Sequence, residues 1–373
     1  MKIERIKTFL TGRSLLVRVY TDEGIIGNGE AGLWAHHPVV KTAIEEFADY
    51  YVGKDPTLME HHQQVVTRDT HFMGAVISAA VSAMDIAMWD ILAKSVGKPV
   101  YALLGGKVRD RVRVFANIGG ATFEERAASA REQVAKGYVS LRTTPFLPGF
   151  EKLGPTAIVN QAVGVVAAIR EAIGPDIDLG LEIHRNLDTD TAIMLGKALE
   201  PYGILYYEDP LGPESIWAVE YVARHVDLPI ATGERFYNIY QFKDLIDSKT
   251  CSMIRPDVSL AGGFTQLKKI AGMAEASFVG IFPHLMGSPV NIATYVQFAA
   301  STPSFRLMES LSADTHPLKG IVDHPPELVD GHIVVPDRPG IGLEILEDEL
   351  PNYPYVPKRI PGQTLKSDGS VTL

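Results

Sequence analysis

The last six of the short apolar runs in the sequence each end in an ionisable residue. Neighbouring members of this series are 23 to 27 residues apart, which is about the length of one strand, one helix and their loops. In a parallel β/α barrel the C-terminal ends of the strands meet at one mouth, where such enzymes carry out their chemistry. The series therefore predicts a ring of reactive side chains made of Glu182, Glu208, Glu234, Asp257, His284 and Glu309.

The first three members of the series are carboxylates, and they indicate a metal site. Clustered carboxylates repel one another and raise one another's pKa unless a cation neutralises them. Oxygen ligands suit a hard cation, Mg²⁺ or Mn²⁺, better than zinc. We therefore predict that one divalent ion, Mg²⁺ with Mn²⁺ as an alternative, is bound by Glu182, Glu208 and Glu234.

The stretch GLEIHRN, residues 180–186, places an acid and an imidazole two positions apart. In a β-strand such positions point to the same face, so Glu182 and His184 would lie side by side. With Glu182 assigned to the metal, proton transfer is the chemistry left to His184.

Asp257 and His284 come from the next two strands of the series. A carboxylate that accepts from one ring nitrogen fixes the tautomer and leaves the other nitrogen as a base. The alternative is a core histidine bonded to a backbone carbonyl. Glu309 would close the ring, where a protonated carboxyl group could donate to a developing oxyanion. Arg142, at the end of the second strand, could neutralise substrate charge or be a surface arginine.

The elements that would position these residues alternate along the chain from about residue 112. Short β-rich runs are separated by amphipathic helical segments, a pattern typical of a parallel β/α barrel. A doubly wound sheet competes, but no Gly-x-Gly-x-x-Gly turn follows a strand. The eight runs are VRVFANI, YVSLRTT, IDLGLEIH, ILYYEDP, PIATGE, SMIRPDVS, FVGIFPH and FRLMES.

The two ends of the sequence do not alternate in this way. The first third reads as two strands followed by a long Ala-rich helix that ends near Lys94 and Gly97, which is an α+β pattern. From about residue 335 the chain is rich in Pro and Gly, and we expect it to pack on the first third. The prediction is a capping domain of residues 1–115 plus 335–373 and a barrel domain of residues 116–334.

Composition limits the function. The chain has 373 residues and a net charge of -10, which argues against a nucleic-acid or anionic-membrane partner. Cys251 is the single cysteine, so a disulfide or a Cys-based zinc site is not expected. We find no apolar signal region at the start and no apolar run long enough to span a membrane. A cytoplasmic homo-oligomer acting on a small molecule is the expectation.

At this point the order of several motifs resembles the enolase superfamily, and within it the mandelate racemase subgroup. The similarity is greatest to acid-sugar dehydratases of the galactonate type. It implies a (β/α)₇β barrel, a modified TIM barrel, with an α+β capping domain. The motifs are MDIAMWDILAK, YYEDP, IATGE, IRPDVS, FPH and PGIGLEI, in that order along the chain.

The resemblance also implies roles for the ring residues. It makes Glu182, Glu208 and Glu234 the Mg²⁺ ligands and supports a base formed by His284 with Asp257. It makes His184 the acid that expels water. The implied reaction is the dehydration of a sugar acid to a 2-keto-3-deoxy acid, which begins with loss of the C2 proton and passes through a metal-stabilised enediolate. In the capping domain, Trp34, His36 and His37 are candidates for reading the distal hydroxyls.

Three features depart from the subgroup or leave alternatives open. The first metal ligand is usually Asp, whereas this chain has Glu182. The second strand carries Arg142 and Thr144 in place of the Lys-x-Lys of racemases, which counts against an epimerase or cycloisomerase. Mannonate dehydratases carry an arginine at that position together with a loop tyrosine, but residues 145–155, PFLPGFEKLGP, contain no tyrosine. A mannonate-type dehydratase ranks second, and an inactive structural paralogue ranks last.

Overall fold

The computed structural model describes residues 1–69, 71–309, 316–358 and 368–370. These residues belong to two compact units. Unit 1 comprises residues 1–113, 234–243 and 256–359, and unit 2 comprises residues 114–233, 244–255 and 360–373. The predicted boundary between capping and barrel domains is a different division and stays a prediction. The end of the predicted 335–373 segment falls partly outside the described residues.

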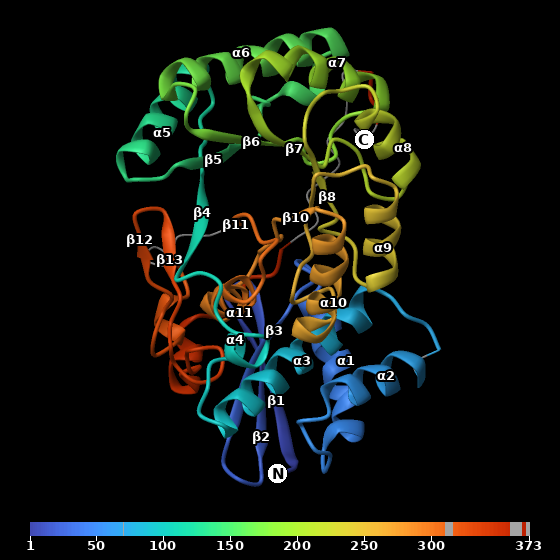
Figure 1. The fold of residues 1–373 in the computed structure, drawn as a ribbon, viewed down its shortest axis with the longest axis vertical. Helices are drawn as coiled ribbons and strands as arrows, with labels where there is room; N and C mark the ends of the chain where they lie inside the picture. The colour runs from blue at the N-terminus through green and yellow to red at the C-terminus, as the bar shows by residue number, and fades with distance from the viewer. Residues whose placement is uncertain (70, 310–315, 359–367, 371–373) are drawn as a thin grey trace. The chain divides into compact units, whose positions relative to one another are not determined.

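Between residues 111 and 309, eight strands alternate with seven helices in the described part of the chain (Figure 1). Every β-rich run noted in the sequence contains one of these strands, so the predicted (β/α)₇β order is confirmed. The order is β4 (Arg111–Asn117), α5 (Phe123–Ala135), β5 (Ser140–Thr143), α6 (Pro155–Ile173), β6 (Asp178–Glu182), α7 (Thr189–Leu199), β7 (Ile204–Glu208), α8 (Ile216–Ala223), β8 (Ile230–Thr232), α9 (Ile239–Asp247), β9 (Met253–Ile254), α10 (Gly263–Ala276), β10 (Gly280–Ile281), α11 (Pro289–Ala300) and β11 (Met308–Glu309).

In unit 2 the strands from β4 to β9 pair in chain order, and every pair is parallel. The register places Glu182 of β6 opposite Glu208 of β7, and Glu208 opposite Ala231 of β8. Because parallel strands present their C-terminal ends at one edge, this register brings two of the predicted metal ligands to the same edge.

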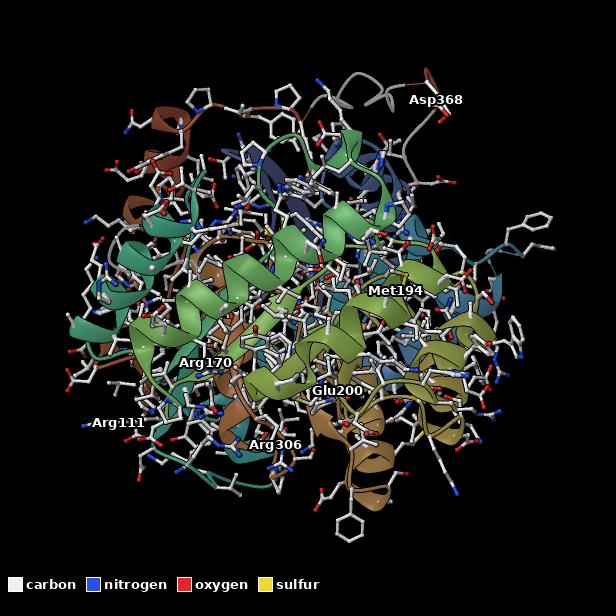
Figure 2. The ribbon with its side chains drawn as sticks, turned by 90° about the horizontal axis from the view of Figure 1, so that it is seen from above. Arg111, Arg170, Met194, Glu200, Arg306 and Asp368 are labelled. Atoms are coloured by element: carbon white, nitrogen blue, oxygen red, sulfur yellow. The ribbon has the colours of Figure 1, made fainter. Side chains whose placement is uncertain are left out.

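Arg170, near the end of α6, secures the other end of these strands. Its guanidinium group donates to the carbonyls of Ile177, just before β6, and of Tyr202 and Gly203, just before β7. Figure 2 shows α6 and α7 side by side, with Arg170 and Met194 labelled on them. One half-buried arginine therefore fixes the starting points of the two strands that carry Glu182 and Glu208.

Unit 1 begins with a three-stranded antiparallel sheet and the helix predicted from the Ala-rich stretch. Gly29 of β3 allows the sheet to approach that helix closely, because a Cβ there would collide with the carbonyl of Ala83. The elements are β1 (Ile3–Thr11), β2 (Ser14–Thr21), β3 (Ile26–Ala31), α1 (His37–Tyr51), α2 (Met59–Asp69), α3 (Ala75–Ser95) and α4 (Val100–Leu103).

Two helices, α3 and α6, are long and apolar enough to cross a membrane by length and composition, although the sequence pattern had predicted no such segment. The buried core helix of a globular unit has the same composition. In α3, 72% of the apolar stretch is buried within the protein, and its buried residues pack against the β1–β3 sheet. The absence of a membrane partner stays a prediction.

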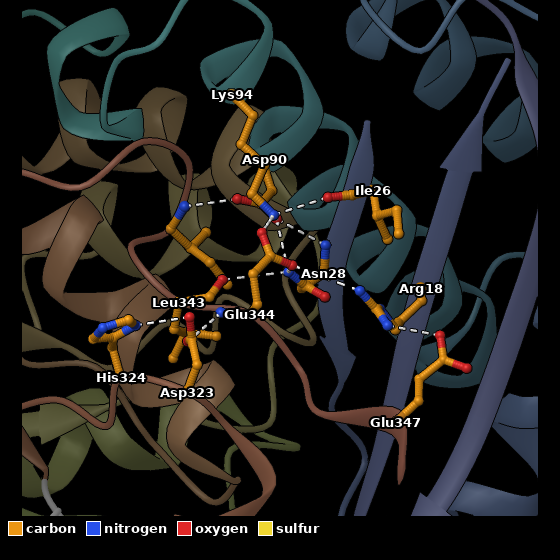
Figure 3. Close-up of polar contacts among 11 residues, drawn as sticks. Arg18, Ile26, Asn28, Asp90, Lys94, Asp323, His324, Leu343, Glu344 and Glu347 are labelled. Atoms are coloured by element: carbon orange, nitrogen blue, oxygen red, sulfur yellow. Dashed lines mark hydrogen bonds and ion pairs between the residues drawn. The ribbon is translucent and has the colours of Figure 1, made fainter. Parts of the chain in front are cut away.

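The chain after residue 335 returns to the first third of the sequence, as expected (Figure 3). Asp90 of α3 accepts a hydrogen bond from the backbone of Ile341, and Lys94 pairs with both Asp90 and Glu344. Arg18 of β2 pairs with Glu347 at 2.7 Å. Before this segment, β12 (Leu328–Val329) and β13 (His332–Val334) form a hairpin, and β13 pairs with residues 111–113. These polar contacts hold the C-terminal segment inside unit 1.

Candidate active site

Two arginines, one half-buried and one fully buried, stand beside the carboxylates at the ends of β6 and β7. Arg142 Nη2 lies 3.1 Å from Glu182 Oε2, and Arg142 Nη1 lies 3.8 Å from Glu208 Oε1. Arg255, which is fully buried, has its Nε 2.8 Å from Glu208 Oε1. Arg142 is therefore no surface arginine: it faces the predicted metal ligands, and its guanidinium group lies over the ring of Phe115.

Glu208 has the surroundings of a metal ligand. Burial raises its pKa well above the usual range, Arg142 and Arg255 lower it, and the neighbouring carboxylate of Glu182 raises it. Neither of its carboxylate oxygens accepts a hydrogen bond of good geometry from the described residues. A buried anion without hydrogen-bond donors is costly unless a cation faces it. Because both of its oxygens lack hydrogen bonds in the described part of the chain, Glu208 has lone pairs available to coordinate the predicted metal ion.

Glu234 follows Gly233 directly after β8, the strand next to β7. Together with Glu182 and Glu208 it makes a set of three carboxylates that could hold a metal ion. The set offers oxygen ligands only, which is the donor chemistry that Mg²⁺ and Mn²⁺ prefer.

His184 does not share a strand face with Glu182, so that expectation was wrong. Strand β6 ends at Glu182, and His184 and Arg185 have φ values of 59° and 63°, in the left-handed region. The backbone N–H of His184 donates to Glu182 Oε1 at 2.7 Å. This strained turn holds the metal-ligand candidate by a main-chain bond and leaves the imidazole of His184 exposed.

In unit 1 the predicted pair of His284 and Asp257 is formed. The ring nitrogen Nδ1 of His284 lies 2.8 Å from Asp257 Oδ2, with the Asp257 side chain buried. The other oxygen of Asp257 accepts bonds from the backbone and hydroxyl of Ser259 and from the hydroxyl of Tyr295. Because Asp257 is held by several donors, it can fix the His284 tautomer with Nε2 free of the proton.

The electrostatics of unit 1 make His284 more basic than an ordinary histidine. Burial lowers its pKa, but the negative charge of Glu234, the hydrogen bond and charge of Asp257, and the charge of Glu309 outweigh burial and raise the pKa to about 9. A group with this pKa takes up a proton readily, as a general base must. A cation bound to Glu234 would reduce the largest of the raising effects.

The loop that carries His284 is tied to Glu309 and to Glu30. The backbone N–H of Leu285 donates to Glu309 Oε2 at 3.3 Å. Buried Glu30, in β3, accepts from the backbone and hydroxyl of Ser288 and from the backbone of Asn291. These bonds connect the first residues of the chain to the loop after the predicted base.

The three capping-domain candidates have different surroundings. Trp34 is half-buried and lines a cavity in unit 1, whereas His36 is exposed just before α1. His37 is buried as the first residue of α1, and its ring lies edge-on to Tyr355. Burial, with a smaller contribution from His36, lowers the pKa of His37 to about 4. Trp34 is thus the candidate with the clearest access to a ligand.

Sequence reasoning missed three residues that complete this geometry: Arg255, Tyr295 and Glu30. Arg255 lies within IRPDVS, two positions before Asp257, and a charged residue between apolar strand residues and a proline was a usable signal. Glu30 lies in the run IIGNGEA, where a lone carboxylate in a buried strand was a similar signal. Tyr295 is one of many helical residues, and its sequence gave no such signal.

Two family models match the chain. Residues 4–105 match the mandelate racemase / muconate lactonizing enzyme N-terminal domain, and residues 125–349 match the enolase C-terminal domain-like family. The chain is 35% identical to D-galactonate dehydratase of Pectobacterium atrosepticum over 362 residues, which is 93% of each protein. It is 34% identical to the D-galactonate dehydratase of Ralstonia pickettii, again over 93% of each protein.

Solved structures resemble the fold along its length. An enolase of Agrobacterium radiobacter with bound sodium and L-malate, for which galactarate dehydratase activity has been suggested, is 30% identical and gives a TM-score of 0.93, covering 100% of this chain and 99% of that one. A protein of Mesorhizobium loti, for which dehydratase activity has been suggested, is 30% identical and gives a TM-score of 0.89. The match covers 95% of this chain and 99% of that one. With both family domains matched in order and the (β/α)₇β sequence of elements present, the chain belongs to the mandelate racemase / muconate lactonizing enzyme family of the enolase superfamily.

Proposed function

We propose that this enzyme is a Mg²⁺-dependent hydro-lyase that converts a sugar acid, a galactonate-like aldonate or aldarate, into a 2-keto-3-deoxy acid. The observation that carries the proposal is the hydrogen bond of 2.8 Å between His284 and Asp257, which leaves the far nitrogen of His284 to act as a base. The relatives named above as D-galactonate dehydratases support the reaction class and the substrate class.

The reaction needs a strong base and a means of stabilising negative charge. The proton on the carbon next to a carboxylate is very weakly acidic, so the charge that develops on the carboxylate oxygens must be stabilised. A divalent cation held by Glu182, Glu208 and Glu234 would supply that electrostatic stabilisation when bound.

His284 takes the proton from C2 of the substrate at Nε2. Asp257, bonded to Nδ1, stabilises the imidazolium that forms and keeps the ring in one orientation. Glu309, whose carboxylate is bonded to the backbone N–H of Leu285, donates a hydrogen bond to the developing oxyanion when it is protonated.

His184 then protonates the hydroxyl on C3, which leaves as water. Its imidazole is exposed on the left-handed turn directly after β6, so it is accessible to a substrate. The C–O bond at C3 breaks, a double bond forms between C2 and C3, and the enol product rearranges to the 2-keto-3-deoxy acid. Arg142, next to Glu182, is placed to offset negative charge at this end of unit 2.

The test is a panel of aldonic and aldaric acids incubated with the enzyme and Mg²⁺, scored for 2-keto-3-deoxy product. Product from an acid of galacto configuration supports the proposal. Product from mannonate alone would favour the mannonate-type alternative, and C2 inversion without water loss would favour an epimerase. His284→Asn serves as the inactive control, and Lys54→Gln, an exposed substitution in unit 1, serves as the active one.

The setting of the enzyme is part of the same proposal. We expect it to act in the cytoplasm as a homo-oligomer, without a nucleic-acid or membrane partner. Cell fractionation and light scattering of the purified protein would test both expectations.

A further inference from the structure

A cavity of about 610 Å³ lies in unit 1 between the β1–β2 turn, the Trp34 loop and the segment that follows His284. Its polar and charged lining residues are Arg13, Ser14 and His316, and no acidic side chain among the described residues lines it. Nothing in the proposed mechanism accounts for a cavity with a cation and without an anion in a protein whose net charge is -10.

Two cations meet at this cavity. Arg13 lines it, and the ammonium group of Lys358 lies 3.1 Å from the centroid of the Trp34 ring, which also lines it. Burial lowers the pKa of Lys358, and repulsion by the positive charge of Arg13 lowers it further. Neither pairs with an acidic side chain among the described residues. An anion between them would relieve that repulsion.

The chain holds Lys358 in this place through backbone contacts. Gly12 donates its N–H to the carbonyl of Tyr353, and its own carbonyl accepts from Val356. The Thr11 hydroxyl donates to the same Tyr353 carbonyl at 2.8 Å. The C-terminal segment thus runs along the β1–β2 turn, which brings Lys358 to the Trp34 ring and Arg13.

The Trp34 loop is strained and closely packed. Leu33 and Ala35, on either side of Trp34, have φ values of 66° and 76°, which side chains other than glycine rarely adopt. Before them, Gly32 donates to the carbonyl of Ser259 at 2.7 Å, and a Cβ on Gly32 would meet that carbonyl at 2.8 Å. The two left-handed residues and the contact of Gly32 with Ser259 together fix the backbone of the loop that carries Trp34.

The cavity also borders the segment that carries the predicted base. Met286 and Gly287, the second and third residues after His284, line it. His316 donates from Nε2 to the carbonyl of Gly287 and accepts at Nδ1 from the backbone of Leu318. Both ring nitrogens are therefore used in a neutral imidazole, so Arg13 and Lys358 supply the positive charge of the cavity.

We propose that Arg13, Lys358 and Trp34 form a subsite for a negatively charged group at the distal end of the substrate, so that the preferred substrate is a sugar acid with two anionic ends. This inference rests on the proposed function and narrows its substrate class. The shared chemistry is a terminal anion, which is a carboxylate in an aldarate and a phosphate in a phosphorylated aldonate. An aldonate, which ends in a neutral hydroxymethyl group, would leave the two cations facing each other.

The test compares three acids that share the galacto configuration and differ at C6: galactonate, galactarate and 6-phosphogalactonate. For the wild-type enzyme we expect kcat/KM to favour one of the two dianions over galactonate by about tenfold or more, and the better dianion identifies the terminal group. Arg13→Gln and Lys358→Gln should each lower kcat/KM for that dianion about tenfold while galactonate changes less than about twofold. The control is Lys54→Gln, which removes an exposed charge at the other end of α1 and should change neither value.

A second measurement separates this inference from the proposed function. Calorimetry of galactarate, 6-phosphogalactonate and galactonate binding to His284→Asn with Mg²⁺ reports affinity without turnover. If no sugar acid is dehydrated but the dianion still binds more tightly and loses that advantage in Arg13→Gln and Lys358→Gln, the proposed reaction fails and the subsite stands. The subsite is overturned if the wild-type enzyme shows no preference for a dianion. It is also overturned if both variants lower kcat/KM for galactonate as much as for the dianion.

Discussion

Glu208 in unit 2 and Asp257 in unit 1 are both buried carboxylates that follow a parallel strand, yet their surroundings differ. Asp257 accepts bonds from the Ser259 backbone and hydroxyl, the Tyr295 hydroxyl and His284. Glu208 faces the guanidinium groups of Arg142 and Arg255, and its oxygens accept no well-formed hydrogen bond from the described residues. One carboxylate is satisfied by donors and can hold a histidine, whereas the other faces two guanidinium groups and keeps oxygen lone pairs that a metal ion could use.

The largest effect on activity should come from removing the negative charge of Glu208. Glu208→Gln replaces a buried anion by a neutral amide, so Mg²⁺ should no longer bind and activity should disappear. For the wild-type enzyme, Mg²⁺ at about 100 times its Kd should add about 2.7 kcal/mol to the free energy of unfolding. Chelation should abolish wild-type activity, and added Mg²⁺ should restore it.

Thermal unfolding with and without Mg²⁺ measures this effect apart from activity. Without metal, Glu208→Gln should be less stable than the wild-type protein, because fully buried Arg255 loses its charge partner. The matched control is Glu132→Gln on α5, which removes an exposed carboxylate paired with Lys136. Full activity after exhaustive chelation, or an unchanged Mg²⁺ shift in Glu208→Gln, would contradict the metal assignment.

The next effect separates the two histidines, one from each unit. His284→Asn should lower both C2 proton exchange and dehydration by about 10²- to 10⁴-fold, because the base is gone. His184→Asn should lose dehydration to a similar extent but continue to exchange the C2 proton for deuterium. Incubation with a working substrate in heavy water, followed by NMR, measures both reactions. The roles are reversed if His284→Asn exchanges and His184→Asn does not.

A third effect concerns the hydrogen bonds around Asp257. The active form of a base is the neutral one, so kcat/KM should rise with pH until the pKa of His284 has been passed. That pKa is raised to about 9 without a cation on Glu234, and bound Mg²⁺ should bring it lower. Asp257→Asn removes one of the groups that raise this pKa, so the rising limb should move to lower pH. The maximal rate should also fall, because the ring tautomer is no longer fixed.

The pH profile distinguishes this role from a structural one. A variant that only disturbed packing would lower the rate at every pH and leave the position of the limb unchanged. An unmoved limb in Asp257→Asn would therefore show that Asp257 does not act on the base. Glu30→Gln, which loosens the Ser288 and Asn291 contacts without touching His284, provides a comparison of that kind.

The alternation of strands and helices could be predicted from the sequence because each β/α unit repeats the same pattern. That repeat also placed the ionisable residues at strand ends, since a buried apolar run that stops at an acid is a local signal. The pair of His284 and Asp257 followed from the same repeat, and the structure forms it.

Other parts of the geometry depend on contacts between distant residues. Tyr295 reaches Asp257 across 38 positions, and Glu30 reaches Ser288 across 258, so no local pattern could reveal either bond. The turn at His184 was missed for another reason. Alternation predicts one strand face for positions two apart, but a left-handed residue after Glu182 ends the strand.

The smallest effect we expect tests the departure of Glu182 from the aspartate usual in this subgroup. Its Oε2 lies 3.1 Å from Arg142 while Oε1 accepts the backbone N–H of His184 at 2.7 Å, so the longer side chain reaches both the second strand and the following turn. In Glu182→Asp the shorter side chain cannot keep both contacts, and Mg²⁺ affinity should fall about tenfold. Calorimetric titration of Mg²⁺ measures the change, with the exposed Glu132→Asp as control. If Glu182→Asp binds Mg²⁺ as tightly as the wild-type enzyme, the extra methylene is neutral, and the bond to His184 does not orient the ligand.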